Sequence, residues 1–163
     1  MRYHNITKDD MLNGEGLRVV LWLAGCTHRC PGCHNPITWD INGGLIFDDK
    51  AKQEIFTELE KEYISGITLS GGDPLHPSLI NEVEQLLKEI KVLFPNKTIW
   101  LYTGYDFEDI KGLSFIKDID VIVDGKFIIS LLDKQLHWRG SSNQRVIDVN
   151  KTLKSKTLIH YTQ

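Results

Sequence analysis

Residues 18–36 read RVVLWLAGCTHRCPGCHNP, and this stretch joins an apolar segment to a loop that holds every cysteine of the chain. The segment from Arg18 to Ala24 is rich in β-branched and other apolar residues, which is typical of a strand buried inside a sheet. Cys26, Cys30 and Cys33 follow it within eight residues. The stretch therefore predicts a buried strand that delivers three thiols to one end of a sheet.

Three thiols so close in sequence are suited to a single metal centre. Three thiolates can bind three irons of a four-iron cubane and leave the fourth iron without a protein ligand. An open metal position allows chemistry, whereas a site closed by four protein ligands is usually structural. The alternative is a structural zinc site with His28 or His34 as fourth ligand. Zinc folds, however, usually combine two separated ligand clusters, and no second cluster follows in this chain.

The composition is ordinary for one soluble globular domain. The chain has 163 residues, of which 41% are hydrophobic and 25% are charged, and we expect residues 1–163 to form a single domain. The net charge of −3 gives no electrostatic reason to expect nucleic acid or a membrane as partner. The first residues lack the apolar core of a signal peptide, and clustered cysteines in a cysteine-poor chain favour the reducing cytoplasm.

Predicted strands and helices alternate along the chain. We expect strands over residues 18–24, 66–70, 98–103, 119–124, 145–149 and 157–161, and helices over residues 48–63, 77–94 and 107–116. This α/β pattern implies parallel strands with helical crossovers. Ligands of such sheets gather at the carboxyl ends of the strands. Those ends carry the cysteine loop and residues 71–74, 103–104 and 124–126, which predicts one shared site.

Two motifs together resemble the radical S-adenosylmethionine superfamily: Cys26-x-x-x-Cys30-x-x-Cys33, and Ser70-Gly71-Gly72-Asp73-Pro74. The resemblance implies that the three cysteines bind one [4Fe–4S] cluster per chain. It also implies that the open iron takes the amino and carboxylate groups of S-adenosylmethionine. Gly71, Gly72 and Asp73 would contact the same amino group through the backbone.

Gly32 departs from the superfamily pattern, because most members carry an aromatic residue just before the third cysteine. The departure narrows the resemblance to glycyl-radical-enzyme activases that serve anaerobic ribonucleoside-triphosphate reductase, where Cys-Pro-Gly-Cys is usual. Further segments agree with that family, namely residues 13–16, 69–77, 102–105, 123–127 and 138–145. The similarity spans about residues 1–148, and the tail after about residue 148 carries no signature.

The same resemblance extends the expected contacts with S-adenosylmethionine to Gly32, His34, Thr103, Asp124 and Lys126. For Lys126 the ordinary alternative is a solvated side chain, and for Asp124 it is the start of a turn. The polar loop over residues 138–145 is either solvated or a surface that docks the partner protein or closes over the site.

The implied fold is an incomplete (β/α)-type barrel with parallel strands, open on one side because the chain is short. The implied activity is reductive cleavage of S-adenosylmethionine at the cluster, followed by abstraction of a hydrogen atom from a glycine of the reductase. An electron donor such as a flavodoxin would supply the electron. No catalytic side chain is expected beyond the cluster and the cofactor, because hydrogen-atom abstraction needs no general acid or base. A pyruvate formate-lyase activase and a deazaguanine synthase are the alternatives within the superfamily.

Overall fold

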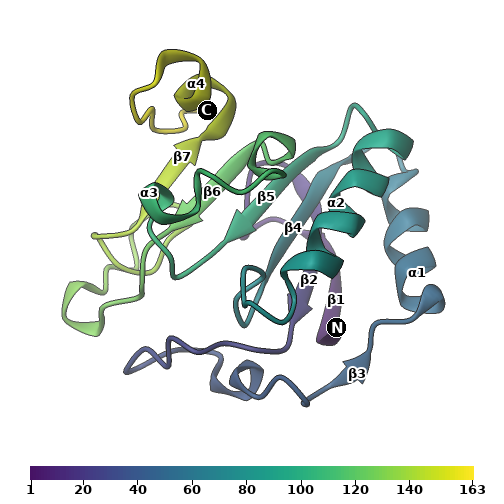
Figure 1. The fold of residues 1–163 in the computed structure, drawn as a ribbon, viewed down its shortest axis with the longest axis horizontal. Helices are drawn as coiled ribbons and strands as arrows, with labels where there is room; N and C mark the ends of the chain where they lie inside the picture. The colour runs from purple at the N-terminus through teal and green to yellow at the C-terminus, as the bar shows by residue number, and fades with distance from the viewer.

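The computed structural model describes residues 1–163 and contains one seven-stranded mixed sheet (Figure 1). The strand order is β3-β1-β2-β4-β5-β6-β7. The strands are β1 (Arg2–Asp10), β2 (Leu17–Leu23), β3 (Leu45–Ile46), β4 (Ile64–Gly71), β5 (Thr98–Tyr102), β6 (Val121–Asp124) and β7 (Arg145–Asp148). The four central strands β2, β4, β5 and β6 are parallel, while β1, β3 and β7 pair antiparallel with their neighbours. An α/β sheet with a parallel centre is therefore confirmed.

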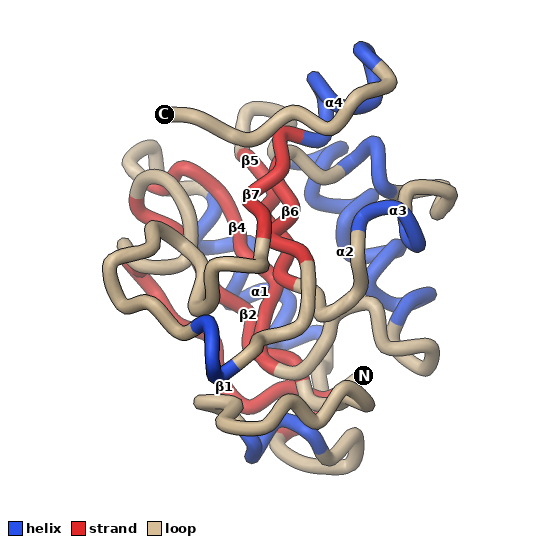
Figure 2. Tube along the Cα trace, turned by 90° about the vertical axis from the view of Figure 1, so that its left-hand side faces the viewer, coloured by secondary structure: helices blue, strands red, loops and turns tan.

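Three helices and three short 3-10 turns lie between the strands, and a fourth helix follows the last strand. The helices are α1 (Asp49–Leu59), α2 (Ile80–Leu93), α3 (Phe107–Ile110) and α4 (Val149–Ser155), and the 3-10 turns are η1 (Pro36–Trp39), η2 (Ile116–Asp118) and η3 (Ile129–Leu131). Helix α1 begins where the Asp48 carboxylate accepts a hydrogen bond from the Ala51 amide at 2.9 Å. Figure 2 shows α2 and α3 on one side of the sheet and loops on the other.

The main core lies between the sheet and the helices. Val19, Leu21 and Leu23 of β2 are fully buried in it, and they alternate along the strand as one face of a sheet requires. Apolar side chains of α1 and α2, such as Ile55 and Leu87, complete this core. The strand predicted over residues 18–24 thus carries the cysteine loop on a rigid support.

The opposite face of the sheet holds a smaller aromatic cluster. The ring of Trp100 on β5 packs edge-on against Trp138 at 4.9 Å and against Tyr161 at 5.1 Å between centroids. His160 forms an isolated bridge with Ile147 of β7, so the tail lies against the sheet. The tail that carries no sequence signature therefore has a packing role.

Arg18 is completely buried under this aromatic cluster and has no carboxylate in direct contact. Its guanidinium donates hydrogen bonds of 2.8–3.0 Å to the Thr68 and Thr98 hydroxyls and to the carbonyls of Glu15, Ile67 and Thr98. Burial lowers the pKa of Arg18 to about 10. Neutral acceptors therefore hold a buried cation that ties β2, β4 and β5 together.

Replacing Arg18 with Met is expected to lower the free energy of unfolding by about 2 kcal/mol, because buried acceptors lose their donor while the volume is retained. Arg18→Lys keeps a charge but loses the planar arrangement of five donors. Its free energy of unfolding should therefore lie between those of Arg18→Met and the wild type. Urea denaturation monitored by circular dichroism measures both. An Arg18→Met protein as stable as the wild type would show that the acceptors find other partners.

Several elements differ from the sequence-based expectations. Strand β1 was not predicted, because its residues are largely polar and only Ile6 is buried; such a strand is tolerated near a sheet edge. The helix predicted over residues 107–116 stops at Ile110, two residues before Gly112, and continues only as η2. The strand predicted over residues 157–161 is wrong, since that segment forms a single bridge.

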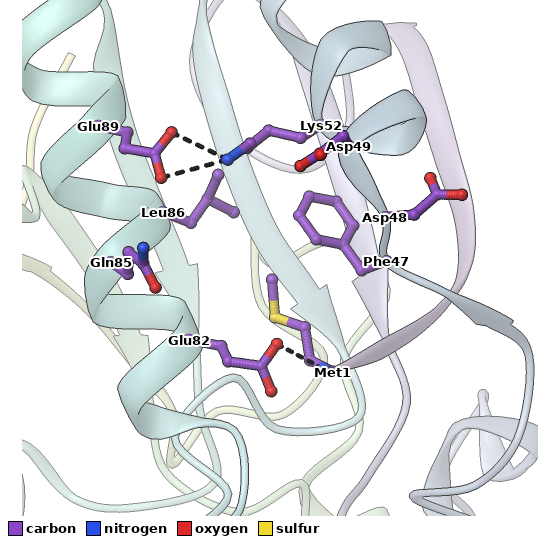
Figure 3. A pocket seen from close by; sticks show the side chains of 9 residues that line it. All are labelled: Met1, Phe47, Asp48, Asp49, Lys52, Glu82, Gln85, Leu86 and Glu89. Carbon is purple, nitrogen blue, oxygen red and sulfur yellow. Dashed lines mark hydrogen bonds and ion pairs between the residues drawn. The ribbon is translucent and has the colours of Figure 1, made fainter.

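A hollow between α1 and α2 lies outside the predicted site (Figure 3). Its charged groups include two ion pairs: the Met1 ammonium group with Glu82, and Lys52 with Glu89 at 3.1 Å. None of its lining residues is a predicted site residue. None of the helices combines the length and the apolar character that crossing a membrane requires.

Candidate active site

The cysteine loop leaves β2 at the edge where β4, β5 and β6 also end. Its base is hydrogen-bonded to the glycine motif that follows β4: the Gly72 amide donates to the Leu23 carbonyl, and the Asp73 amide donates to the Gly25 carbonyl, each at 2.7 Å. The Gly25 amide in turn donates to the Thr38 carbonyl at 2.7 Å. The two motifs, which are separated by 36 residues in the sequence, therefore form one structural unit.

One open hollow of about 590 Å³ gathers most of the predicted site. The predicted residues that line it are Cys26, Cys30, Cys33, His34, Gly71, Gly72, Asp73 and Thr103. The hollow is also lined by residues that were not among the expected cluster ligands or contacts with S-adenosylmethionine: His28, Thr38, Trp39, Ser70, Tyr102, Gly104, Gly125, Phe127 and Gln144. We call it the cysteine hollow. Residues expected at the carboxyl ends of several strands therefore lie around one hollow.

Three predicted contacts lie outside the lining of the cysteine hollow. Gly32 has a φ of +75°, and a Cβ on it would lie 2.3 Å from Ile129 Cδ1. Packing against that side chain is thus one reason for a glycine inside the cysteine motif. Asp124 is completely buried, and Lys126 lines a neighbouring hollow.

Asp73 is held entirely by groups of the protein. Its carboxylate accepts hydrogen bonds from the Thr103 hydroxyl at 2.9 Å, the Gly104 amide at 2.9 Å and the Leu75 amide at 2.9 Å. His28 Nε2 lies 2.7 Å from Asp73 Oδ2, and both side chains are over 90% buried. The Asp73 side chain therefore connects the cysteine loop, the glycine motif and the end of β5.

The glycine motif is shaped by close contacts between backbone segments. A Cβ on Gly71, whose φ is +101°, would lie 2.4 Å from the Leu23 amide nitrogen. A Cβ on Gly72 would lie 2.4 Å from the Gly25 carbonyl oxygen. Both glycines are thus required for the cysteine loop to approach β4, independently of any ligand.

The three cysteines are half-buried and unpaired. Burial raises the pKa of the Cys26 thiol, while the backbone amides of His28 and Arg29 act in the opposite direction. The Asn35 amide lies 3.4 Å from Cys33 Sγ and donates to it.

Nowhere do three Cys, His, Asp or Glu side chains surround one point as a single metal ion requires. Thiolates on one zinc ion lie about 3.8 Å apart, as Zn–S bonds of about 2.3 Å imply, whereas a cubane binds each thiolate through a separate iron.

Asp124, which is buried, forms an ion pair with the partly exposed Arg145 behind the site. Its carboxylate accepts hydrogen bonds from the Phe107 amide at 2.7 Å and from Arg145 Nε at 3.0 Å. Arg145 also binds Glu108 at 2.8 Å and lowers the pKa of that carboxyl group. The pair joins β6, β7 and α3, which is a structural role that the sequence alone did not indicate.

The polar loop over residues 138–145 is held in place by hydrogen bonds of the Gln144 side chain. The Gln144 side-chain oxygen accepts hydrogen bonds from the Gly140 and Ser141 amides at 3.0 and 3.1 Å. Its side-chain nitrogen donates to the Gly125 carbonyl at 3.0 Å. Gln144 thereby reaches the cysteine hollow. The sequence marked residues 138–145 as a loop that could close over the site, but it did not single out Gln144, whose place depends on the antiparallel pairing of β6 and β7.

Comparison with known proteins agrees with these features. A family model described as a 4Fe-4S single cluster domain matches residues 12–147. A protein of Enterobacteria phage T4 named anaerobic ribonucleoside-triphosphate reductase-activating protein is 49% identical over 146 residues, which cover 90% of this chain and 93% of the relative. Relatives with the same name are 42% identical in Escherichia coli (strain K12), with 90% and 97% covered, and 41% identical in Haemophilus influenzae, with 88% and 96% covered.

These matches span nearly all of both chains, and the family model includes the cysteine loop and the glycine motif. They confirm the family that the two motifs indicated. The chain belongs to the family of anaerobic ribonucleoside-triphosphate reductase-activating proteins.

Proposed function

We propose that this protein generates a glycyl radical in an anaerobic ribonucleoside-triphosphate reductase, at the expense of S-adenosylmethionine. The observation that carries the proposal is the convergence of Cys26, Cys30 and Cys33 with Gly71 and Gly72 around one hollow at the carboxyl edge of the sheet. The names of the relatives and the iron–sulfur family model support it.

The donor set suits a [4Fe–4S] cluster with one open iron. Cys26, Cys30 and Cys33 would hold three irons, and the chain has no fourth cysteine. The Nε2 atom of His28 contacts Asp73, and this contact holds the cysteine loop against the glycine motif. When bound, the cluster supplies one electron to the sulfonium of S-adenosylmethionine, and the resulting 5′-deoxyadenosyl radical takes a hydrogen atom from the glycine Cα.

The residues of the hollow would bind and orient S-adenosylmethionine. The Gly72 and Asp73 amides already donate to protein carbonyls, so the motif offers the amino group of the cofactor carbonyl acceptors. Thr103 and Asp73 keep the motif in place, and His34, which lines the cysteine hollow, would contact the cofactor. We include Gly32, Asp124 and Lys126 in the proposed surroundings of the cofactor, with Asp124 acting through Arg145 and the end of β6.

The open side of the site suits a macromolecular substrate. We propose that residues 1–163 act as one domain, in which the sheet is an incomplete (β/α) barrel whose missing strands leave room for the glycine segment of the reductase. A flavodoxin-like protein is the proposed electron donor. The net charge of −3 supports a partner other than nucleic acid.

The decisive experiment mixes the anaerobically reconstituted protein with S-adenosylmethionine, a reductant and a reductase whose glycines carry deuterium. We expect about four irons per chain, a glycyl radical signal in electron paramagnetic resonance, and deuterium in the released 5′-deoxyadenosine. Colourless protein with one zinc ion and no cleavage of S-adenosylmethionine would refute the proposal. Cleavage of S-adenosylmethionine that gives no glycyl radical on the reductase and no deuterium in the 5′-deoxyadenosine would favour a pyruvate formate-lyase activase or a deazaguanine synthase.

A further inference from the structure

Beside the cysteine hollow lies a run of exposed apolar side chains, Ile128, Ile129, Leu131 and Leu132, which we call the apolar loop. These side chains are 41–54% exposed, and no charged residue interrupts residues 128–132. A contiguous exposed apolar surface is uncommon on a monomeric protein and marks a site of interaction.

The exposure of the apolar loop is built into the fold. The Ile128 amide donates to the buried Ser141 hydroxyl at 3.1 Å, and the Ser142 amide donates to the Leu131 carbonyl at 2.9 Å. Leu132 also forms a bridge with Ser141. The backbone of the apolar loop is therefore fixed while its side chains stay exposed. Binding a partner here would not add the entropic cost of ordering a mobile loop.

The apolar loop is continuous with the site. The side chain of Ile129 packs over Gly32, which lies between Cys30 and Cys33 in the sequence. Ile128 lines a second open hollow, of about 1020 Å³, together with Lys126 and Asn143. This hollow adjoins the cysteine hollow, since His28 and Gly104 line both. The apolar loop thus contacts the cysteine loop at Gly32, and it borders a hollow that shares two lining residues with the cysteine hollow.

Resting on the proposed function, we propose that the apolar loop docks the segment of the reductase that carries the glycine. Abstraction of a hydrogen atom requires the glycine Cα within about 3–3.5 Å of the reacting carbon. The polypeptide on either side of that glycine must therefore cross the rim of the cysteine hollow. The partner segment is extended, with a glycine at the point of entry and apolar side chains beside it that cover Ile128, Leu131 and Leu132.

The test compares two double variants that each replace two neighbouring exposed aliphatic side chains with serine. Leu131→Ser/Leu132→Ser removes half of the apolar loop, while Val92→Ser/Leu93→Ser removes side chains that are 79% and 57% exposed at the far end of α2. Helix α2 follows β4 and returns to the opposite edge of the sheet, so the second variant leaves the rim intact. Both sets of residues lie on the surface, and thermal denaturation should show both variants folded.

Affinity for the reductase is measured directly by biolayer interferometry, with reconstituted protein and S-adenosylmethionine present. Leu131→Ser/Leu132→Ser should bind about tenfold more weakly, which corresponds to about 1.4 kcal/mol, and the control should stay within about twofold. Cleavage of S-adenosylmethionine by dithionite without reductase should be the same in all three proteins. An unchanged affinity, or an equal loss in the control, would overturn the inference.

Two further outcomes show whether the docking inference or the proposed chemistry is wrong. If gel filtration shows that the apolar loop joins two copies of this chain, and the reductase binds the Leu131→Ser/Leu132→Ser variant normally, the occupant is a second copy and the inference is wrong. If the wild type fails to cleave S-adenosylmethionine but the variant still loses affinity for the reductase, the proposed chemistry is wrong and the docking surface stands.

Discussion

A Cys30→Ala variant is expected to lose reductive cleavage of S-adenosylmethionine by about 1,000-fold or more, equivalent to about 4 kcal/mol of transition-state stabilisation. Cys30 is the middle member of three thiols on one hollow, and no spare cysteine can replace it. The variant should also take up less iron on anaerobic reconstitution. Cleavage is measured as 5′-deoxyadenosine released with excess dithionite, so that the natural electron donor does not limit the rate.

Two observations would decide whether the loss is specific. The Cys30→Ala apoprotein should unfold within about 1 kcal/mol of the wild-type apoprotein, because a half-buried thiol without a protein partner contributes little to the fold. His76→Ala, at a partly exposed side chain in the turn after the glycine motif, should keep cleavage near the wild-type level. Retained cleavage in Cys30→Ala and in the matching Cys26 and Cys33 variants would refute the ligand assignment.

The second large effect is expected at Asp73. An Asp73→Ala substitution leaves the Thr103 hydroxyl, the Gly104 amide and the Leu75 amide without their acceptor inside the fold, and it releases His28. We expect the free energy of unfolding of the apoprotein to fall by about 3 kcal/mol, since each buried group without a partner costs about 1–3 kcal/mol and local relaxation recovers part of it.

Asp73→Ala should also reduce iron uptake, because His28 links the cysteine loop to the glycine motif only through this carboxylate. Asp73→Asn retains the shape but turns an NH₂ group toward protein donors, so its stability should fall between those of Asp73→Ala and the wild type. Asp106→Ala, at an exposed carboxylate nearby, is the matched control and should change little. Urea denaturation and iron analysis measure these effects; an Asp73→Ala protein with wild-type stability would show that the network is not structural.

The sequence allowed a good prediction of the parallel centre of the sheet. Strands β2, β4, β5 and β6 are apolar runs bounded by turn residues, and such runs identify themselves by composition. The antiparallel strands were harder to predict. Strand β1 is polar because it lies near the edge, and the direction of β7 depends on its pairing with β6 rather than on its own residues.

By itself, the sequence determined the chemistry: three thiols on one short loop, a glycine motif after a strand, and the family to which both point. Metal ligation depends on residue type and spacing within a loop, and both are properties of the chain. Only the tertiary structure decided how the motifs meet. Asp73 proves to be a buried acceptor that binds the cysteine loop through His28, and Gly32 proves to pack under Ile129 of the apolar loop. Such contacts join residues far apart in the chain, so they depend on how strands pair and loops pack, which no local pattern records.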